Sequence, residues 1–339
     1  MAVGRKLNPM AVASPLSVLP TMAGDLSRLE ERLRAAVVAE DSYLTEIASH
    51  LIEAGGKRVR PGFSIAAAGT RHADAVEASP DVLMGGVSVE LVHIGSLYHD
   101  DVMDEAELRR GAASVNANWG NLRAILAGDF LLARASEIAA SLGTEVAGLL
   151  AATIGQLCEG QILELRDAYN VDRTEDDYER SIAGKTASLL ATACRVGGIV
   201  GEIPRADIDA VTEFGHAYGM AFQIVDDILD VVATDEQLGK PAGNDLFEGV
   251  YTLPVLRAMH GTAGSELRDL LGGELTVESR DRAREIVRTS DGVDEALDSA
   301  RSYADKAGAV LTSLPDSPAT TALLAAADHL IRRAQDPLA

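Results

Sequence analysis

The chain has 339 residues, of which 47% are hydrophobic and only 4% aromatic, so a large aliphatic core is available in one large domain or two small ones. A formal net charge of −22 excludes nucleic acid and an anionic membrane surface as the main partner. We expect no apolar run long enough to span a bilayer. The two isolated cysteines, Cys158 and Cys194, predict small buried thiols without a disulfide framework and fit a reducing cytoplasm.

The pattern of apolar residues favours an all-α fold, because no sustained alternation of Val, Ile and Thr occurs between tight turns. Residues 1–22 contain three prolines and few charges, which predicts a loose N-terminal tail. Helical periodicity begins near Asp25. A second helix is expected over residues 44–54, ended by Gly55 and Gly56.

Three cations follow these glycines in an otherwise acidic protein. Lys57, Arg58 and Arg60 stand between two helices, and Pro61 suits the first turn of the second one. Glycines that permit close approach, cations and a helix N-terminus together favour a phosphate group. Three solvated cations on a surface loop are the alternative.

The central stretch, residues 87–111, begins as an apolar helix and ends in Asp100, Asp101 and Asp104, followed by Arg109 and Arg110. Helical spacing places the three aspartates in one quadrant of the helix. Such carboxylates repel one another unless a cation lies among them, and Mg²⁺ is usually held by one or two carboxylates and a substrate phosphate. A solvated acidic helix end is the alternative.

The same helix carries further polar and small residues one or two turns before the aspartates. His93 lies nearly on the face of Asp100 and could donate to a second anion, or it could be a core histidine. His99 could support the acidic motif or be exposed. Gly95 and Ser96 leave room beneath the metals because their side chains are small.

Two long apolar helices are expected next, over residues 121–142 and 145–168, with a break at Gly143. Thr174 predicts the cap of another helix. Lys185 and Thr186 lie within the apolar face of that helix. A lysine among alanines and leucines is unfavourable unless it meets an anion or reaches solvent along the surface.

A second acidic motif occurs at the end of the helix predicted over residues 208–232. Asp226, Asp227 and Asp230 repeat the spacing of the first motif, and Gln223 lies one turn before Asp227. Two such motifs facing each other across a cavity would provide six carboxylates for several Mg²⁺ ions. That many cations imply a polyanionic ligand, most simply a diphosphate.

The order of these motifs carries a family resemblance. GGKRVRP, HDDVMDEAELRRG, AGKTAS, FQIVDDILD and GKPAGND together resemble the trans-isoprenyl diphosphate synthases, in particular the bacterial long-chain polyprenyl diphosphate synthases. The resemblance implies that residues 23–339 form a single antiparallel helical bundle of the isoprenoid synthase type around a deep central cavity. It also implies a cytoplasmic homodimer that uses Mg²⁺, with three ions when substrate is bound.

The resemblance also implies roles for single residues. The metal ligands would be the aspartates of both motifs: Asp100, Asp101, Asp104, Asp226, Asp227 and Asp230. The allylic diphosphate would be held by Arg109, Lys185, Thr186, Gln223 and Lys240. Isopentenyl diphosphate would be held by Lys57, Arg60, His93 and Arg110. Catalysis would depend on the first motif together with Lys185 and Asp226.

Chain length and activity follow from the same resemblance. Small residues at Gly95 and Ser96 favour a long all-trans product, such as a quinone side-chain precursor, over a geranylgeranyl or farnesyl product. Many relatives have a lysine where this chain has Val250, which puts one phosphate contact in question. A class I terpene cyclase is disfavoured by the second aspartate motif and the few aromatics, and a regulatory subunit by the retained aspartates and cations.

Overall fold

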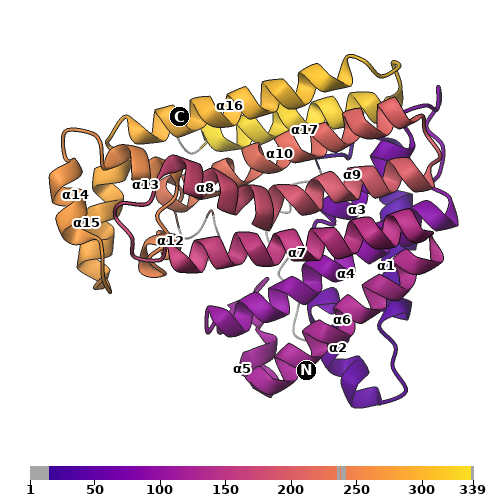
Figure 1. Ribbon diagram of the computed structural model, residues 1–339, viewed down its shortest axis with the longest axis horizontal. Coiled ribbons are helices and arrows are strands. Elements are labelled where there is room, and N and C mark those ends of the chain that lie inside the picture. The colour runs from indigo at the N-terminus through magenta and orange to yellow at the C-terminus, as the bar shows by residue number, and fades with distance from the viewer. Residues whose placement is uncertain (1–14, 235–236, 238–241, 337–339) are drawn as a thin grey trace, which may run out of the picture.

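The computed structural model describes residues 15–234, 237 and 242–336, and helices make up most of this part of the chain (Figure 1). The elements before the middle of the chain are α1 (Met22–Ala36), α2 (Ser42–Glu53), α3 (Val59–Ala68), α4 (Pro80–Met103), β1 (Leu108–Arg109), β2 (Ala112–Ala113), α5 (Val115–Trp119), α6 (Asn121–Ser141) and α7 (Thr144–Arg166). The elements that follow are α8 (Glu175–Ile182), the π-helix η1 (Ala183–Ala187), α9 (Ser188–Val200), α10 (Arg205–Val232), α12 (Asn244–Phe247), α13 (Leu253–Ala258), α14 (Gly264–Leu270), α15 (Val277–Arg288), α16 (Gly292–Leu311) and α17 (Pro318–Gln335).

The long helices α7, α9, α10 and α16 lie side by side, and α14 and α15 gather at one end of this layer (Figure 1). Helix α4 packs against α3, α6 and α9, so it is covered on several sides. This explains why its sequence is apolar almost all round rather than striped. The helix begins at a Ser79 cap, whose hydroxyl accepts from the Val82 amide, with Pro80 in the first turn.

The core is aliphatic, with a small aromatic cluster. Phe63 of α3 contacts Phe214 and Tyr218 of α10 edge-on, with ring centroids 5.7 and 4.6 Å apart. These contacts fix α3 against α10, which carries the second aspartate motif.

Most predicted helices have the expected bounds. The breaks at Gly55 and Gly143 and the Thr174 cap, which accepts a hydrogen bond from the Asp177 amide, are all confirmed. Helix α1 begins at Met22, three residues before the expected start. These signals are local, so they can be read from the sequence.

Three expectations need correction. Leu16 and Leu19 are buried in the core, so the part of the predicted tail that the structure describes is packed; residues 1–14 lie outside the described part. Cys194 is buried but Cys158 is exposed on α7. A short antiparallel hairpin, β1 and β2, follows the first aspartate motif, with positive φ at both Arg110 and Gly111 as a two-residue turn of this type requires.

Helix α7 also differs from expectation. Within the described residues it is the one helix that is long and apolar enough to cross a bilayer, by length and composition alone, although no such run was predicted. Only 22% of the apolar window is buried within the chain. Ile162 and Leu165 are 64% and 48% exposed on its outer face, so α7 presents an uncovered apolar stripe.

Candidate active site

The first aspartate motif lies where the C-terminal end of α4 emerges from the core. His93, Ser96 and Asp100 are half-buried and share one face of this helix. Burial raises the pKa of Asp100 to about 6, against the opposing effect of Lys185. Burial likewise raises the pKa of Asp104, the residue that follows the C-terminal end of α4. A bound cation would favour the ionised form of both neighbouring carboxylates, so the pair is suited to bind one.

Asp101 differs from its two neighbours. Its side chain is fully buried, and its Oδ1 accepts a hydrogen bond of 2.6 Å from Arg109 Nε. Among the described residues, no group donates to its other oxygen. Asp101 therefore orients Arg109 in this structure, while Asp100 and Asp104 remain accessible for a ligand.

The second motif is similarly divided. Asp226 is exposed on α10, whereas Asp227 is buried. The Tyr178 hydroxyl donates to Asp227 Oδ2 at 2.6 Å, and Gln223 Nε2 donates to Oδ1 at 2.8 Å. Burial raises the pKa of Asp227 in spite of these two donors. Asp230 is buried and accepts a hydrogen bond of 3.3 Å from the Asp245 amide.

A π-helix places Lys185 and Thr186 between the two motifs. Helix α7 approaches η1 so closely that a Cβ on Gly160 would lie 2.4 Å from the Lys185 amide nitrogen. Thr186 Oγ1 donates to Gln223 Oε1 at 2.7 Å, and Lys185 Nζ forms an ion pair with Glu164. Burial alone would lower the pKa of Lys185, but the carboxylates of Glu164 and Asp100 raise it. Lys185 therefore remains a cation next to the first motif.

A separate basic group lies around His93, formed by Arg60 and Arg110. Lys57, expected in the same group, has Arg333 and the second-motif Asp226 as its charged neighbours instead. Arg60 Nε has no hydrogen-bond partner among the described residues, and burial lowers the pKa of Arg60 to about 10. Burial and the guanidinium groups of Arg60 and Arg110 hold the pKa of His93 well below its ordinary value. Arg110 Nη1 donates to the Leu51 carbonyl at 3.1 Å. Two guanidinium groups held close together in this way repel each other and are suited to bind an anion.

Arg58, the third cation of the same loop, has another role. It has a left-handed backbone, is 4% exposed and pairs with Glu30 and Glu90, the latter at 2.9 Å. These contacts lock the loop from inside, so Lys57 and Arg60 are held on either side of a structural ion pair.

Electrostatic neighbours connect the two motifs. Lys185 interacts with both Asp100 and Asp104, while Glu164, its ion-pair partner, interacts with Asp227. Within the described part of the chain, no three His, Cys, Asp or Glu side chains meet closely enough to hold a metal ion by themselves. Lys240 lies outside the described residues.

The two residues expected to set product length lie on different sides of α4. A Cβ on Gly95 would lie 3.2 Å from the Gly128 carbonyl oxygen and 3.3 Å from Leu132, so Gly95 faces α6. Ser96 belongs to the half-buried stripe and donates to the His93 carbonyl at 2.9 Å. Of the two, Ser96 is the position open to a change that leaves helix packing intact.

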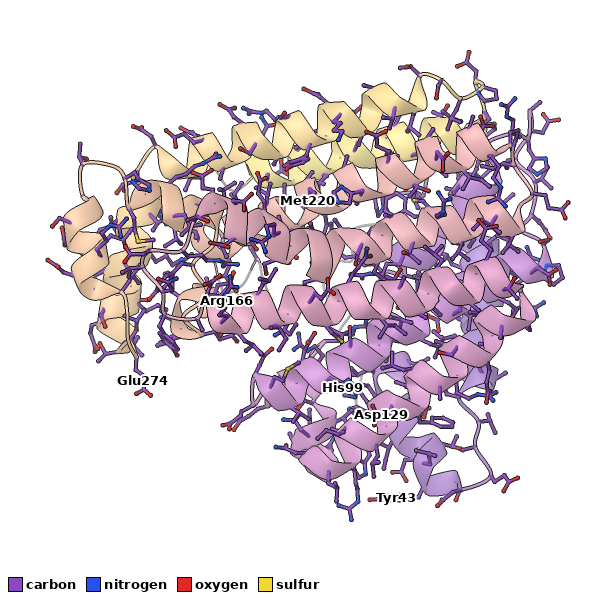
Figure 2. All side chains as sticks on the ribbon, viewed as in Figure 1. Tyr43, His99, Asp129, Arg166, Met220 and Glu274 are labelled. Carbon is purple, nitrogen blue, oxygen red and sulfur yellow. The ribbon has the colours of Figure 1, made fainter. Side chains whose placement is uncertain are left out.

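His99 lies beside Asp129 of α6 (Figure 2), with 3.4 Å between Nε2 and Oδ1. The same ring nitrogen is 3.2 Å from the Ile125 carbonyl oxygen. His99 therefore connects α4 to α6.

Sequence reasoning missed Glu164, Arg173 and the hydroxyl of Tyr178. A buried tyrosine hydroxyl needs a hydrogen-bond partner, and Tyr178 has Asp227, which is distant in the sequence. Glu164 ends a largely apolar stretch of α7, and its partner could not be identified without the π-helix. Nothing in the local pattern distinguishes Arg173 from a surface arginine.

Comparison with known proteins gives one family. Residues 41–289 match the polyprenyl synthetase family. A nonaprenyl diphosphate synthase of Mycobacterium tuberculosis is 39% identical over 315 residues, covering 91% of this chain and 92% of the relative. Component 2 of a heptaprenyl diphosphate synthase of Geobacillus stearothermophilus is 40% identical, covering 87% and 91%. The crystal structure of a decaprenyl diphosphate synthase from Rhodobacter capsulatus superposes with a TM-score of 0.87 at 32% identity, covering 95% of this chain and 100% of that one. The chain therefore belongs to the polyprenyl synthetase family and is an all-α prenyltransferase.

Proposed function

We propose that the chain condenses isopentenyl diphosphate with an allylic diphosphate and repeats the step to give a long-chain all-trans polyprenyl diphosphate, such as a quinone side-chain precursor. The observation that carries this proposal is the presence of cations near two different points of α4, Asp100 at its C-terminal end and His93 two turns earlier. Lys185 lies among the aspartates, while Arg60 and Arg110 surround His93. A reaction of two diphosphates needs two such sites.

The allylic diphosphate is assigned to the group around the motifs. We assign its contacts to Arg109, Lys185, Thr186 and Gln223, with Lys240 added on the resemblance alone. Lys185 is a cation held by Glu164, and Thr186 and Gln223 are already joined by a hydrogen bond. These side chains are ordered before substrate arrives, which reduces the conformational entropy lost on binding.

Isopentenyl diphosphate is assigned to Lys57, Arg60, His93 and Arg110. An arriving diphosphate would supply the acceptor that Arg60 Nε lacks. Its negative charge would also offset the burial, and the smaller repulsion between these cations, that lower the pKa values of Arg60 and His93.

The aspartates suit Mg²⁺. Asp100 at the end of α4, Asp104 just after it and Asp226 on α10 offer accessible carboxylates, although Asp226 is paired with Arg333 at 3.4 Å. Asp101, Asp227 and Asp230 would act from within the protein. Because no three described acidic side chains suffice alone, substrate oxygens would complete the coordination, with up to three ions in the loaded enzyme. When bound, Mg²⁺ neutralises the charge that develops on the departing diphosphate.

The protein's own groups then guide the reaction. Lys185 and Arg109 stabilise the diphosphate as the allylic C–O bond ionises. The cluster around His93 holds the second diphosphate, so that the double bond of isopentenyl diphosphate attacks the allylic cation. The proton lost from the new intermediate passes to the released diphosphate, which requires no side-chain base. Aliphatic side chains along α4 exclude water from the cation.

We also propose a cytoplasmic homodimer. The outer face of α7 carries an apolar stripe that includes Ile162 and Leu165, and α6 exposes Leu122 and Leu126 to 73% and 58%. A second copy could cover both helices by presenting the same surface in return. Light scattering on the purified chain tests this. Ile162→Glu should give a monomer, whereas Val277→Glu, at a position on α15 that is also more than half exposed, should leave the dimer intact.

Incubating the purified chain with Mg²⁺, farnesyl diphosphate and labelled isopentenyl diphosphate tests the reaction. Chromatography of the dephosphorylated products should show one long polyprenol. Products that stop at geranylgeraniol would indicate a short-chain synthase. A hydrocarbon formed without isopentenyl diphosphate would indicate a cyclase, and complete inactivity of the folded chain would indicate a subunit of a heteromeric enzyme.

A further inference from the structure

A buried arginine with unused hydrogen-bond donors lies at the edge of the proposed allylic site. Arg173 is 6% exposed, and its Nη1 donates to the Tyr251 carbonyl at 2.9 Å. Its Nε and Nη2 have no hydrogen-bond partner within the described part of the chain. In the same part, no carboxylate lies within ion-pair distance of the guanidinium group. Burying a cation with two unused donors is unfavourable unless a ligand accepts from them.

The arginine faces a pocket that already contains residues of the site. A space of about 100 Å³ is lined by Arg173, Lys185, Gln223 and Val250 and by four carboxylates, those of Glu164, Asp227, Asp245 and Glu248, so an anion would enter it together with metal cations. Arg173 and Lys185 are the cations among its lining residues. Val250 also lines this space, and it is adjacent to Tyr251, whose carbonyl Arg173 binds.

The segment that carries Arg173 is fixed to the loop that carries Val250. The Tyr169 amide donates to the Gly249 carbonyl at 2.8 Å. The guanidinium of Arg173 also lies over the ring of Tyr178, 5.5 Å from its centroid. Tyr178 in turn binds Asp227. These contacts leave Arg173 little freedom to turn toward solvent, so its two unused donors stay in the pocket.

We infer that Arg173 binds the diphosphate of the allylic substrate through Nε and Nη2. The inference rests on the proposed function for the identity of the ligand. A planar guanidinium with two adjacent donors matches two oxygens of a phosphate group. The competing hypothesis is that Arg173 only balances the negative charge of the carboxylates that line the pocket and does not contact the diphosphate.

Calorimetric titration with inorganic pyrophosphate and Mg²⁺ tests the inference without turnover. Arg173→Met should weaken pyrophosphate binding by about tenfold to a hundredfold, the range for a hydrogen bond to a charged group. It should raise the KM for the allylic substrate and leave the KM for isopentenyl diphosphate unchanged. Adding Val250→Lys to Arg173→Met should restore most of the affinity. Arg173→Lys serves where Arg173→Met does not fold, and should weaken binding to a smaller extent.

Arg268→Met is the matched control. Arg268 donates to the Val171 carbonyl at 2.8 Å and so supports the same segment from outside the pocket. It should lower the thermal midpoint without weakening pyrophosphate binding. If Arg173→Met behaves like Arg268→Met, or if Val250→Lys restores nothing, the inference is wrong. An enzyme that loses pyrophosphate affinity on loss of Arg173 but elongates no prenyl chain would support the anion contact and overturn the proposed function.

Discussion

The close approach of α7 to the π-helix can be tested by adding one methyl group. In Gly160→Ala, the new Cβ would lie 2.4 Å from the Lys185 amide nitrogen and 2.8 Å from the Ser181 carbonyl oxygen. Both atoms belong to the backbone, so neither can rotate away. An ordinary contact begins at 3.4 Å, so the two elements must separate by about 1 Å.

Two consequences can be estimated from that separation. Overpacking of this kind destabilises a protein by about 1–3 kcal/mol. A displacement of about 1 Å at a positioning group lowers the rate by about a hundredfold. Because η1 carries Lys185, we expect Gly160→Ala to lower kcat/KM for the allylic substrate by that amount.

Urea unfolding and steady-state kinetics measure the two effects separately. Gly24→Ala is the control, since Gly24 is an exposed residue of α1 with no atom within 4 Å of its added Cβ. It should leave activity unchanged and raise stability by up to about 1 kcal/mol, as expected for Gly to Ala in an exposed helix. If Gly160→Ala is as stable and as active as Gly24→Ala, the argument from close approach is wrong.

Three further predictions concern single groups of the site. The pKa of Asp100 is raised from 3.8 to about 6 by burial, so the folded state binds the extra proton and stability without metal should fall as pH rises through this window. Urea unfolding in the presence of a chelator should show that the free energy of unfolding of Asp100→Asn depends less on pH than that of the unchanged protein. An equal dependence on pH would contradict the raised pKa of Asp100. Tyr178→Phe removes a buried donor to Asp227 and should lower the free energy of unfolding by about 1–3 kcal/mol, measured by urea denaturation, together with kcat; a neutral effect would show that Asp227 does not depend on this bond. Ser96→Phe should shorten the product seen by chromatography, and an unchanged profile would place the limit of the cavity elsewhere.

The sequence predicted the features that depend on local signals. Helix bounds follow from capping residues and glycine breaks, and the two aspartate motifs were found because their spacing repeats. Which aspartate faces outward was not predictable, because Asp101 turns to Arg109 and Asp227 turns to Tyr178 only in the folded chain. The structural role of Arg58, which differs from that of Lys57 and Arg60, was not predictable for the same reason, since its partner Glu90 lies on α4.

The features that were missed depend on contacts between distant segments. A π-helix has no sequence signal of its own, and here it accompanies the close approach of Gly160 to the backbone at Lys185. The exposed face of α7 was missed for a similar reason. An apolar sequence does not reveal which of its sides is covered by the same chain.

The π-helix has a consequence for protein engineering. Its wider turn holds one more residue than an α-helical turn, so it sets the rotation of α8 about its own axis relative to α9. Deleting one residue from Ala183–Ala187, or redesigning residues 175–200 on an idealised backbone, would turn α8 by about 100°. Tyr178 would then leave Asp227 although every side chain was retained. Designers should therefore treat this irregular turn as part of the template.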